Sequence, residues 1–218
     1  MTDEKLKGTM YEDLDAVKHF RDFENRYVQE VTITRVTGHC PYGHAEGEKY
    51  RVSNCNNDGL CGALYTSLHS SIITMHYWGS LPWLKEPDTY RGICPEMAVE
   101  VEVKRREQEK RALLKTTASA RDMTGKGFPV IDNYRAFIEI VDVDKVCAWG
   151  HRAGHRLEID PFNAGAVCGL LYSKVYPYLN VMLAGVKLPW IPEGEHAMFS
   201  ACPDSYNLTS FCLVVEER

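Results

Sequence analysis

The sequence predicts an α+β protein built from two tandem β-β-α-β repeats, and three observations carry that prediction. A cysteine-rich pattern in the first half of the chain returns in the second half at an offset of 107 residues. Each copy contains runs of alternating apolar and polar residues, which are typical of strands. Each copy also has one stretch whose apolar residues recur at three- and four-residue steps, as in an amphipathic helix. Two such units would bury each other's exposed faces, so we expect them to pack about a pseudo-two-fold axis.

The repeat is visible residue by residue. The segments 40–49 and 147–156 both read Cys-x-[Tyr/Trp]-Gly-His-x-x-Gly-x-[Lys/Arg]. Between positions 40 and 83, thirteen of 44 residues are identical at this offset without a gap. A Cys-Pro pair then recurs at Cys94 and Cys202, after an insertion of one residue. Self-similarity of this kind indicates a duplicated structural unit.

The elements of each copy follow from these patterns. The first copy is expected to have strands at Val31–Val36, Lys49–Val52 and Val99–Val103 and a helix over Leu60–Tyr77. The second copy is expected to have strands at Phe137–Val141, Arg156–Ile159 and Phe211–Val215 and a helix over Ala166–Leu183. Asn and Gly residues before each helical stretch break the chain and can begin a helix.

The rest of the chain is expected to be accessory. Residues 12–27 have apolar side chains at helical spacing and predict an N-terminal amphipathic helix. Residues 104–115 are charged and helix-favouring, which predicts a helical linker with a solvated face. The expected organisation is a helical extension at 1–30, repeat 1 at 31–105, a linker at 106–136 and repeat 2 at 137–218.

Composition narrows the function classes. The chain has 218 residues, is 44% hydrophobic and carries a formal net charge of −5, so it can bury a core but lacks the clustered cations of a nucleic-acid surface. Its first twenty residues contain no apolar run typical of a secretory signal. The longest apolar stretch, Val175–Val186, is shorter than the roughly 20 residues of a membrane-spanning helix. We therefore expect a soluble, cytoplasmic protein that binds neither nucleic acid nor membranes.

Six of the eight cysteines occupy matched positions in the two copies. They form two trios, namely Cys40, Cys61 and Cys94 in the first copy and Cys147, Cys168 and Cys202 in the second. Each copy also has one histidine, His44 or His151, four residues after its first cysteine. Three thiolates and one imidazole are a soft ligand set, which suits an iron–sulfur cluster or zinc. The sequence therefore predicts two metal sites, each with three cysteines and a possible histidine ligand. Of the two metals, an iron–sulfur cluster is the preferred prediction, and the protein would then act as an electron-transfer or enzyme-associated subunit.

Two other interpretations of the cysteines stay open. Cys61 and Cys168 stand at the predicted helix starts, where the helix dipole lowers the pKa of a thiol. A thiolate there, with Glu96 or Asp204 as acid/base partner, would make the chain an enzyme that acts on a small-molecule substrate between the repeats. In the third interpretation the cysteines only pack, no cofactor is bound, and the chain is a non-catalytic interaction subunit with a protein partner or a second copy of itself.

Aromatic residues are repeated beside the cysteines. Tyr65 and Tyr172 follow the helix-start cysteines, while Trp83 and Trp190 end a Leu-Pro-Trp segment in each copy. Residues of these types usually pack in a core or at its edge. In the enzyme or cofactor interpretation, the four side chains would line a pocket next to the thiols.

The combined pattern of Cys-x-x-Gly-His-x-x-Gly, a helix-start Cys, Pro-Trp and Cys-Pro-[Asp/Glu] resembles a family of small, largely uncharacterised bacterial and archaeal proteins that contain one such unit. The resemblance covers residues 31–104 and 137–216, most of the chain. It implies that the six matched cysteines occupy the family's cysteine positions, and that Pro82-Trp83 and Pro189-Trp190 match its Pro-Trp segment. The resemblance implies a shared unit and a shared residue set, without a particular reaction.

Overall fold

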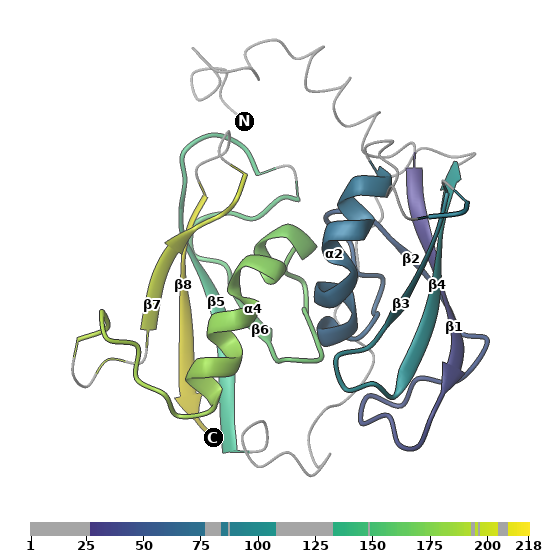
Figure 1. Cartoon of the computed structure of the whole chain (residues 1–218). Coiled ribbons are helices and arrows are strands. Elements are labelled where there is room, and N and C mark those ends of the chain that lie inside the picture. The colour runs from purple at the N-terminus through teal and green to yellow at the C-terminus, as the bar shows by residue number, and fades with distance from the viewer. Residues whose placement is uncertain are drawn as a thin grey trace.

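The computed structural model describes residues 27–76, 84–86, 88–107, 133–147, 149–192, 195, 197–204 and 209–218. These residues form two units, each with one helix on a four-stranded antiparallel sheet (Figure 1). The first unit contains β1 (Tyr27–Val36), β2 (Lys49–Val52), α2 (Gly62–His76), β3 (Thr89–Ile93) and β4 (Val99–Glu107). The second contains β5 (Tyr134–Val143), β6 (Arg156–Ile159), α4 (Gly169–Leu183), β7 (Ala197–Ala201) and β8 (Thr209–Glu217). The prediction of an α+β protein is therefore confirmed.

The two sheets have the same strand order. It is β2-β1-β4-β3 in the first unit and β6-β5-β8-β7 in the second. Both central pairs carry a bulge at the same place, between Ile33 and Arg35 in β1 and between Ile140 and Asp142 in β5. Close to each bulge, a turn glycine donates its N–H to the strand: Gly47 to the Ile33 carbonyl at 2.9 Å, and Gly154 to the Ile140 carbonyl at 2.8 Å. Both glycines have φ of +85°, a backbone conformation that favours glycine over other residues.

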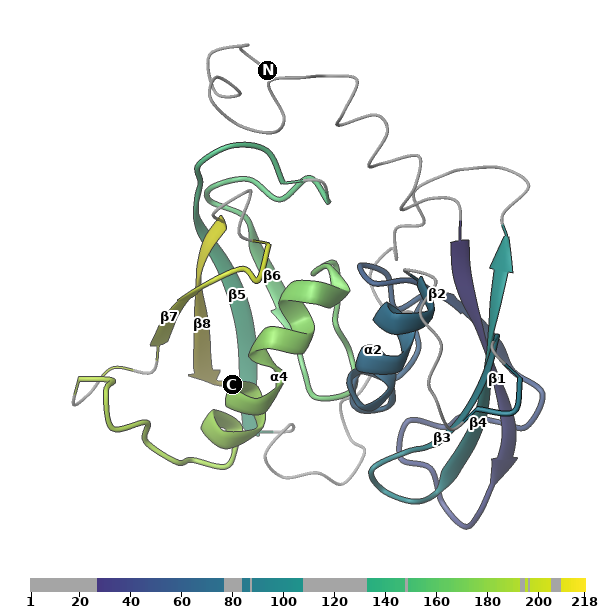
Figure 2. The same ribbon diagram turned by 45° about the horizontal axis from the view of Figure 1, so that its top comes forward.

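The helices lie between the sheets. Figures 1 and 2 show α2 and α4 side by side in the middle of the molecule, each covering the inner face of its own sheet. Each unit has its own core, because alternate strand residues and one face of the helix are buried together. No helix in the described part of the chain is both long and apolar enough to cross a membrane.

The structure differs from the sequence prediction at the sheet edges. Each unit has a strand that was not predicted, β3 or β7, so the order of elements is β-β-α-β-β. These edge strands are short and only partly buried, and therefore lack the alternating apolar pattern of the inner strands. In addition, β4 continues to Glu107, so residues 104–107 are strand where a helical linker was predicted. Pairing with Tyr27–Glu30 of β1 extends this strand beyond its apolar part.

The boundaries of the units also shift. The inner strands begin at Tyr27 and Tyr134, a few residues before the predicted repeats begin. The predicted N-terminal helix at 12–27 lies almost wholly outside the described residues, and so does most of the 106–136 linker.

Candidate functional site

The three cysteine-bearing segments of each unit meet at one end of its sheet. Because β1 and β4 are antiparallel, the turn after β1 and the hairpin before β4 lie at the same end of the sheet. The Thr37 N–H donates to the Ala98 carbonyl at 2.7 Å, which joins the two segments directly. The hairpins are closed by equivalent bonds, from the Cys94 N–H to the Val99 carbonyl and from the Cys202 N–H to the Thr209 carbonyl, both at 2.8 Å.

The Cys-x-[Tyr/Trp]-Gly-His segment is a tight turn that is tied to the start of the helix. The Gly43 N–H donates to the Cys40 carbonyl at 2.8 Å, and Gly43 has φ of +82°. The aromatic residue of the turn donates to a carbonyl just before the helix. This bond runs from Tyr42 Oη to Gly59 at 2.6 Å in the first unit. Its equivalent in the second unit runs from Trp149 Nε1 to Ala166 at 3.1 Å. Tyr and Trp share an apolar ring with one polar hydrogen, which explains why either serves here.

The thiols of each trio are close enough to influence one another's ionisation. In the first unit, charge on Cys94 or Cys40 raises the pKa of the Cys61 thiol, and charge on Cys40 raises that of Cys94. In the second unit, burial raises the pKa of Cys168 most, followed by the charges of Cys55, Cys202 and Cys147. The helix-start cysteines are the most deeply buried, with Cys61 at 4% and Cys168 at 5% exposure. The cysteines of each predicted trio thus lie within range of electrostatic interaction with one another.

Backbone N–H groups are directed at the sulfur atoms. Cys61 receives hydrogen bonds from the N–H groups of Ala63 and Leu64, in the first turn of α2, and these bonds lower its pKa. Cys168 receives one from Leu171 at the equivalent place in α4. At the hairpins, Cys94 receives one from Glu96 and Cys202 one from Asp204. Donors of this kind stabilise a negatively charged sulfur.

Burial nevertheless dominates the ionisation of these thiols. It raises the pKa of Cys61 to about 12 and that of Cys202 to about 11, and it raises the pKa of Cys168 well above its ordinary value. The helix start acts on Cys61 and Cys168 in the expected direction, but burial outweighs it and the net pKa of both thiols is raised. The cost of burying a thiolate among apolar side chains and other thiols exceeds the benefit of one or two N–H donors.

Both histidines are buried, and His151 lies beside the start of α4. Nε2 of His151 accepts a hydrogen bond of 3.3 Å from the Cys168 N–H, so this nitrogen is engaged with the backbone. Nδ1 of His44 lies 3.0 Å from Tyr50 Oη and 3.2 Å from Glu48 Oε2.

The network around His44 is specific to the first unit. The Tyr50 hydroxyl donates to Glu48 at 2.7 Å, which completes a triangle of the three side chains. The equivalent positions in the second unit are His155 and Leu157, so the triangle has no counterpart there.

The remaining predicted site residues occupy different environments. Glu96 and Asp204 stay next to Cys94 and Cys202, where their charges raise the pKa of those thiols. Tyr65 and Tyr172 are fully buried, and their hydroxyls donate to carbonyls: Tyr65 to Ser53 and Asn54, both at 2.9 Å, and Tyr172 to Asp160 at 2.8 Å.

The two predicted tryptophans add little to the site. Trp190 is 63% exposed and packs edge-on against Tyr178, with ring centroids 6.4 Å apart. Trp83 lies outside the described residues. One aromatic residue missed by the sequence analysis is Tyr176 of α4, which packs against the core of the first unit and interacts electrostatically with Cys61 and Cys94.

All eight cysteines lie in the described part of the chain, and each is a thiol rather than half of a disulfide. Within the described residues, no group of three or more His, Cys, Asp or Glu side chains has the spacing needed to hold one metal ion. Comparison with protein families, curated sequences and solved structures gives no match for this chain.

Proposed function

We propose that this protein binds two thiophilic metal centres, one per unit, with an iron–sulfur cluster ahead of zinc. The observation that carries the proposal is the gathering of Cys40, Cys61 and Cys94 at one end of the first sheet, repeated by Cys147, Cys168 and Cys202 in the second. A soft cation is the partner that binds neighbouring cysteines by displacing their protons and coordinating the resulting thiolates.

The environment of the sulfurs fits such a centre. The backbone N–H donors around Cys61 and Cys168 stabilise a thiolate ligand much more than a neutral thiol. Hydrogen bonds to sulfur also tune the reduction potential of an iron–sulfur cluster. The high pKa of Cys61 and Cys168 means that binding must displace their protons, which makes uptake favourable only for a cation with high affinity for sulfur. When bound, a cluster would supply one-electron transfer.

Within the described residues no three His, Cys, Asp or Glu side chains are placed to hold a metal ion, so binding by either trio would require its thiols to move closer together.

The high thiol pKa also bears on the enzyme interpretation. A thiol whose pKa is about 12 is protonated near neutral pH and is a weak nucleophile. This favours ligation over nucleophilic catalysis by Cys61 with Glu96.

We further infer that the two units arose by duplication of one ancestral unit of the small family that they resemble, and that they pack about a pseudo-two-fold axis. Reciprocal contacts support this arrangement. The Gly62 N–H donates to the Phe162 carbonyl at 2.6 Å, and the Gly169 N–H donates to the Cys55 carbonyl at 2.7 Å. The two donors are 107 residues apart, and so are the two acceptors. The proposed setting is the cytoplasm, as an electron-transfer or enzyme-associated subunit.

Anaerobic purification, followed by a visible spectrum and by iron, sulfide and zinc analysis, tests the proposal. We expect bound iron and sulfide at two centres per chain, and a loss of one centre each in Cys61→Ser and Cys168→Ser. The matched control is Cys212→Ser, because Cys212 is a buried cysteine of β8 outside both trios. Folded wild-type protein that is colourless and metal-free would refute the proposal and favour cysteines that only pack.

A further inference from the structure

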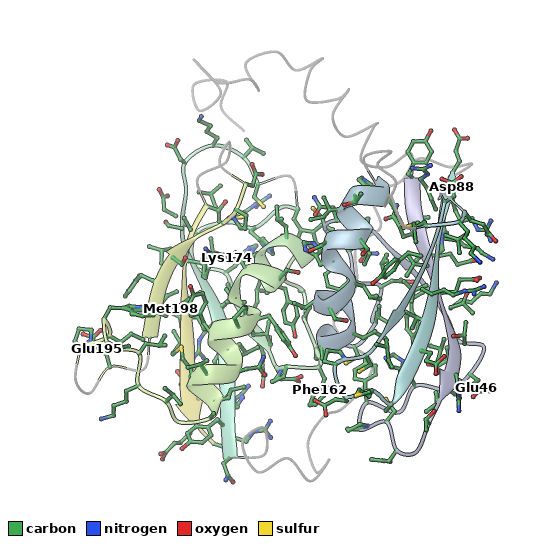
Figure 3. All side chains as sticks on the ribbon, viewed as in Figure 1. Glu46, Asp88, Phe162, Lys174, Glu195 and Met198 are labelled. Atoms are coloured by element: carbon green, nitrogen blue, oxygen red, sulfur yellow. The ribbon has the colours of Figure 1, made fainter. Side chains whose placement is uncertain are left out.

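The outer edge of the second sheet is an exposed strand. β7 pairs with β8 on one side, and within the described residues no strand pairs with its other side. Met198 of this strand is buried at 4% exposure, whereas the next residue, Phe199, faces outward and is 71% exposed. Figure 3 shows Met198 at the left-hand side of the molecule, away from the first unit. The outer edge of β7 and the Phe199 ring are therefore accessible to another molecule.

The equivalent edge of the first sheet is charged. Arg91 in β3 corresponds to Phe199 in β7, since each is the central residue of a five-residue edge strand. The Arg91 side chain is 81% exposed, and its Nη2 lies 3.4 Å from Oε2 of Glu102 in β4. Lys104 of β4 also pairs with Glu102, at 2.6 Å. Charged side chains on and beside an edge strand protect it against pairing with a second chain.

The edge formed by β7 and β8 lacks this protection. Cross-strand partners share a face of the sheet, so the residues on the outer face with Phe199 are Ala197, Ala201, Ser210, Cys212 and Val214. None of these side chains is charged near neutral pH. The equivalent face of the first unit carries Arg91, Glu100, Glu102 and Lys104. Because the two sheets have the same strand order, the fold itself does not require this difference, and the uncharged face is specific to the second unit.

We infer that β7 pairs with β7 of a second copy of this chain, in antiparallel orientation, so that the two second-unit sheets join into one continuous sheet. Antiparallel pairing of identical strands generates a two-fold axis, and the same surface serves both copies. With Phe199 at the centre of the pair, Phe199 lies opposite Phe199 of the second copy, and Ala197 lies opposite Ala201. The inference does not depend on metal binding.

A second copy fits this edge because β7 can meet itself without a conflict of charge. The same arrangement at β3 would place Arg91 opposite Arg91, and like charges directly opposite each other destabilise a strand pair. None of the five residues of β7 is charged, and aromatic residues opposite each other stabilise a strand pair. Each chain also carries a formal net charge of −5, so two copies approach each other most easily where their surfaces are uncharged.

Sedimentation velocity of the reduced, full-length protein, from low micromolar to sub-millimolar concentration, tests the inference. We expect a reversible equilibrium between monomer and dimer, because a pair of five-residue strands is a small interface. Phe199→Arg, which gives β7 the central residue of β3, should weaken dimerisation by at least about tenfold, whereas Phe199→Tyr should preserve it. The matched control is Arg91→Ser, which changes an equally exposed position on the other edge strand and should leave dimerisation unchanged.

Hydrogen exchange of the wild-type chain then locates the contact. Amide exchange in β7 should slow as the protein concentration rises, while exchange in β3 should not change. A wild-type chain that stays monomeric at every concentration would overturn the inference and leave this edge to a different partner. A dimer that Phe199→Arg does not weaken, or that leaves exchange in β7 independent of concentration, would place the interface elsewhere and overturn it too. If Phe199→Arg does not fold, the exchange measurement on the wild type decides alone.

Discussion

The buried Asp160 carboxyl group should make the stability of the protein depend on pH, and the equivalent turn of the first unit supplies the control. One oxygen of Asp160 accepts hydrogen bonds from the N–H groups of Phe162 and Asn163, at 2.7 and 2.8 Å. Ser53, the equivalent residue of the first unit, accepts the same pair of bonds with its hydroxyl, from Cys55 at 3.3 Å and Asn56 at 3.2 Å. Asp160→Ser should therefore keep the turn and remove its charge.

The size of the pH-dependent contribution of Asp160 to the free energy of unfolding follows from the burial of its carboxyl group. Burial raises the pKa of Asp160 to about 6 from 3.8, although its two N–H donors act in the opposite direction. The folded state therefore binds more protons than the unfolded state between these two values. The contribution to stability is fully present below pH 3.8 and is lost as the pH rises through about 6. At about 1.4 kcal/mol per pKa unit, it amounts to roughly 3 kcal/mol.

Urea denaturation of the wild type and of Asp160→Ser at closely spaced pH values between 4 and 7.5 measures this contribution. The free energy of unfolding of the wild type, minus that of the variant, should fall by up to roughly 3 kcal/mol as the pH rises over this range. Taking the difference cancels the carboxyl groups that the two proteins share. A difference that stays constant with pH, or that rises, would show that Asp160 is not buried as a carboxyl group and would refute the reasoning.

Three further substitutions test the contacts that hold the site and the units together. Gly169→Ala should cost at least about 1–3 kcal/mol in urea denaturation, because a Cβ there would lie 2.6 Å from Cζ of Tyr65; unchanged stability would contradict the close approach of the helices. Tyr65→Phe should cost about 1–3 kcal/mol, because it removes the one hydroxyl hydrogen that the Ser53 and Asn54 carbonyls share, and Asn54 keeps only His69 Nε2 at 3.2 Å; a smaller loss would imply that water replaces the hydroxyl group. Tyr42→Phe should lower stability and metal retention by removing the bond to Gly59, whereas Tyr42→Trp, which imitates Trp149, should retain both; equal effects of the two would exclude this role.

The regular part of the fold could be predicted from the sequence because local patterns determine it. The alternation around Val31 and Ile138, and the apolar spacing of each helix, reflect which side chains face a core, and these elements are where they were expected. The edge strands β3 and β7 were missed, because a short strand that is paired on one side and only partly buried needs no strong periodic pattern. The predicted inner strand β4 ended too early, at Val103. Beyond Val103 the residues are charged, and pairing with β1 overrides their local preference for a helix.

For the candidate site, too, some features could be predicted from the sequence and others depend on the tertiary structure. The recurrence of six cysteines at matched positions selects the two trios, since a repeated unit places equivalent residues in equivalent places. What the sequence left undetermined is the environment of the thiols. Their pKa depends on burial by distant segments, and a helix-start position alone suggested the opposite direction for Cys61. The backbone bonds from Gly62 to Phe162 and from Gly169 to Cys55 depend on how the two units pack their helices together, and no local pattern in either segment encodes that contact.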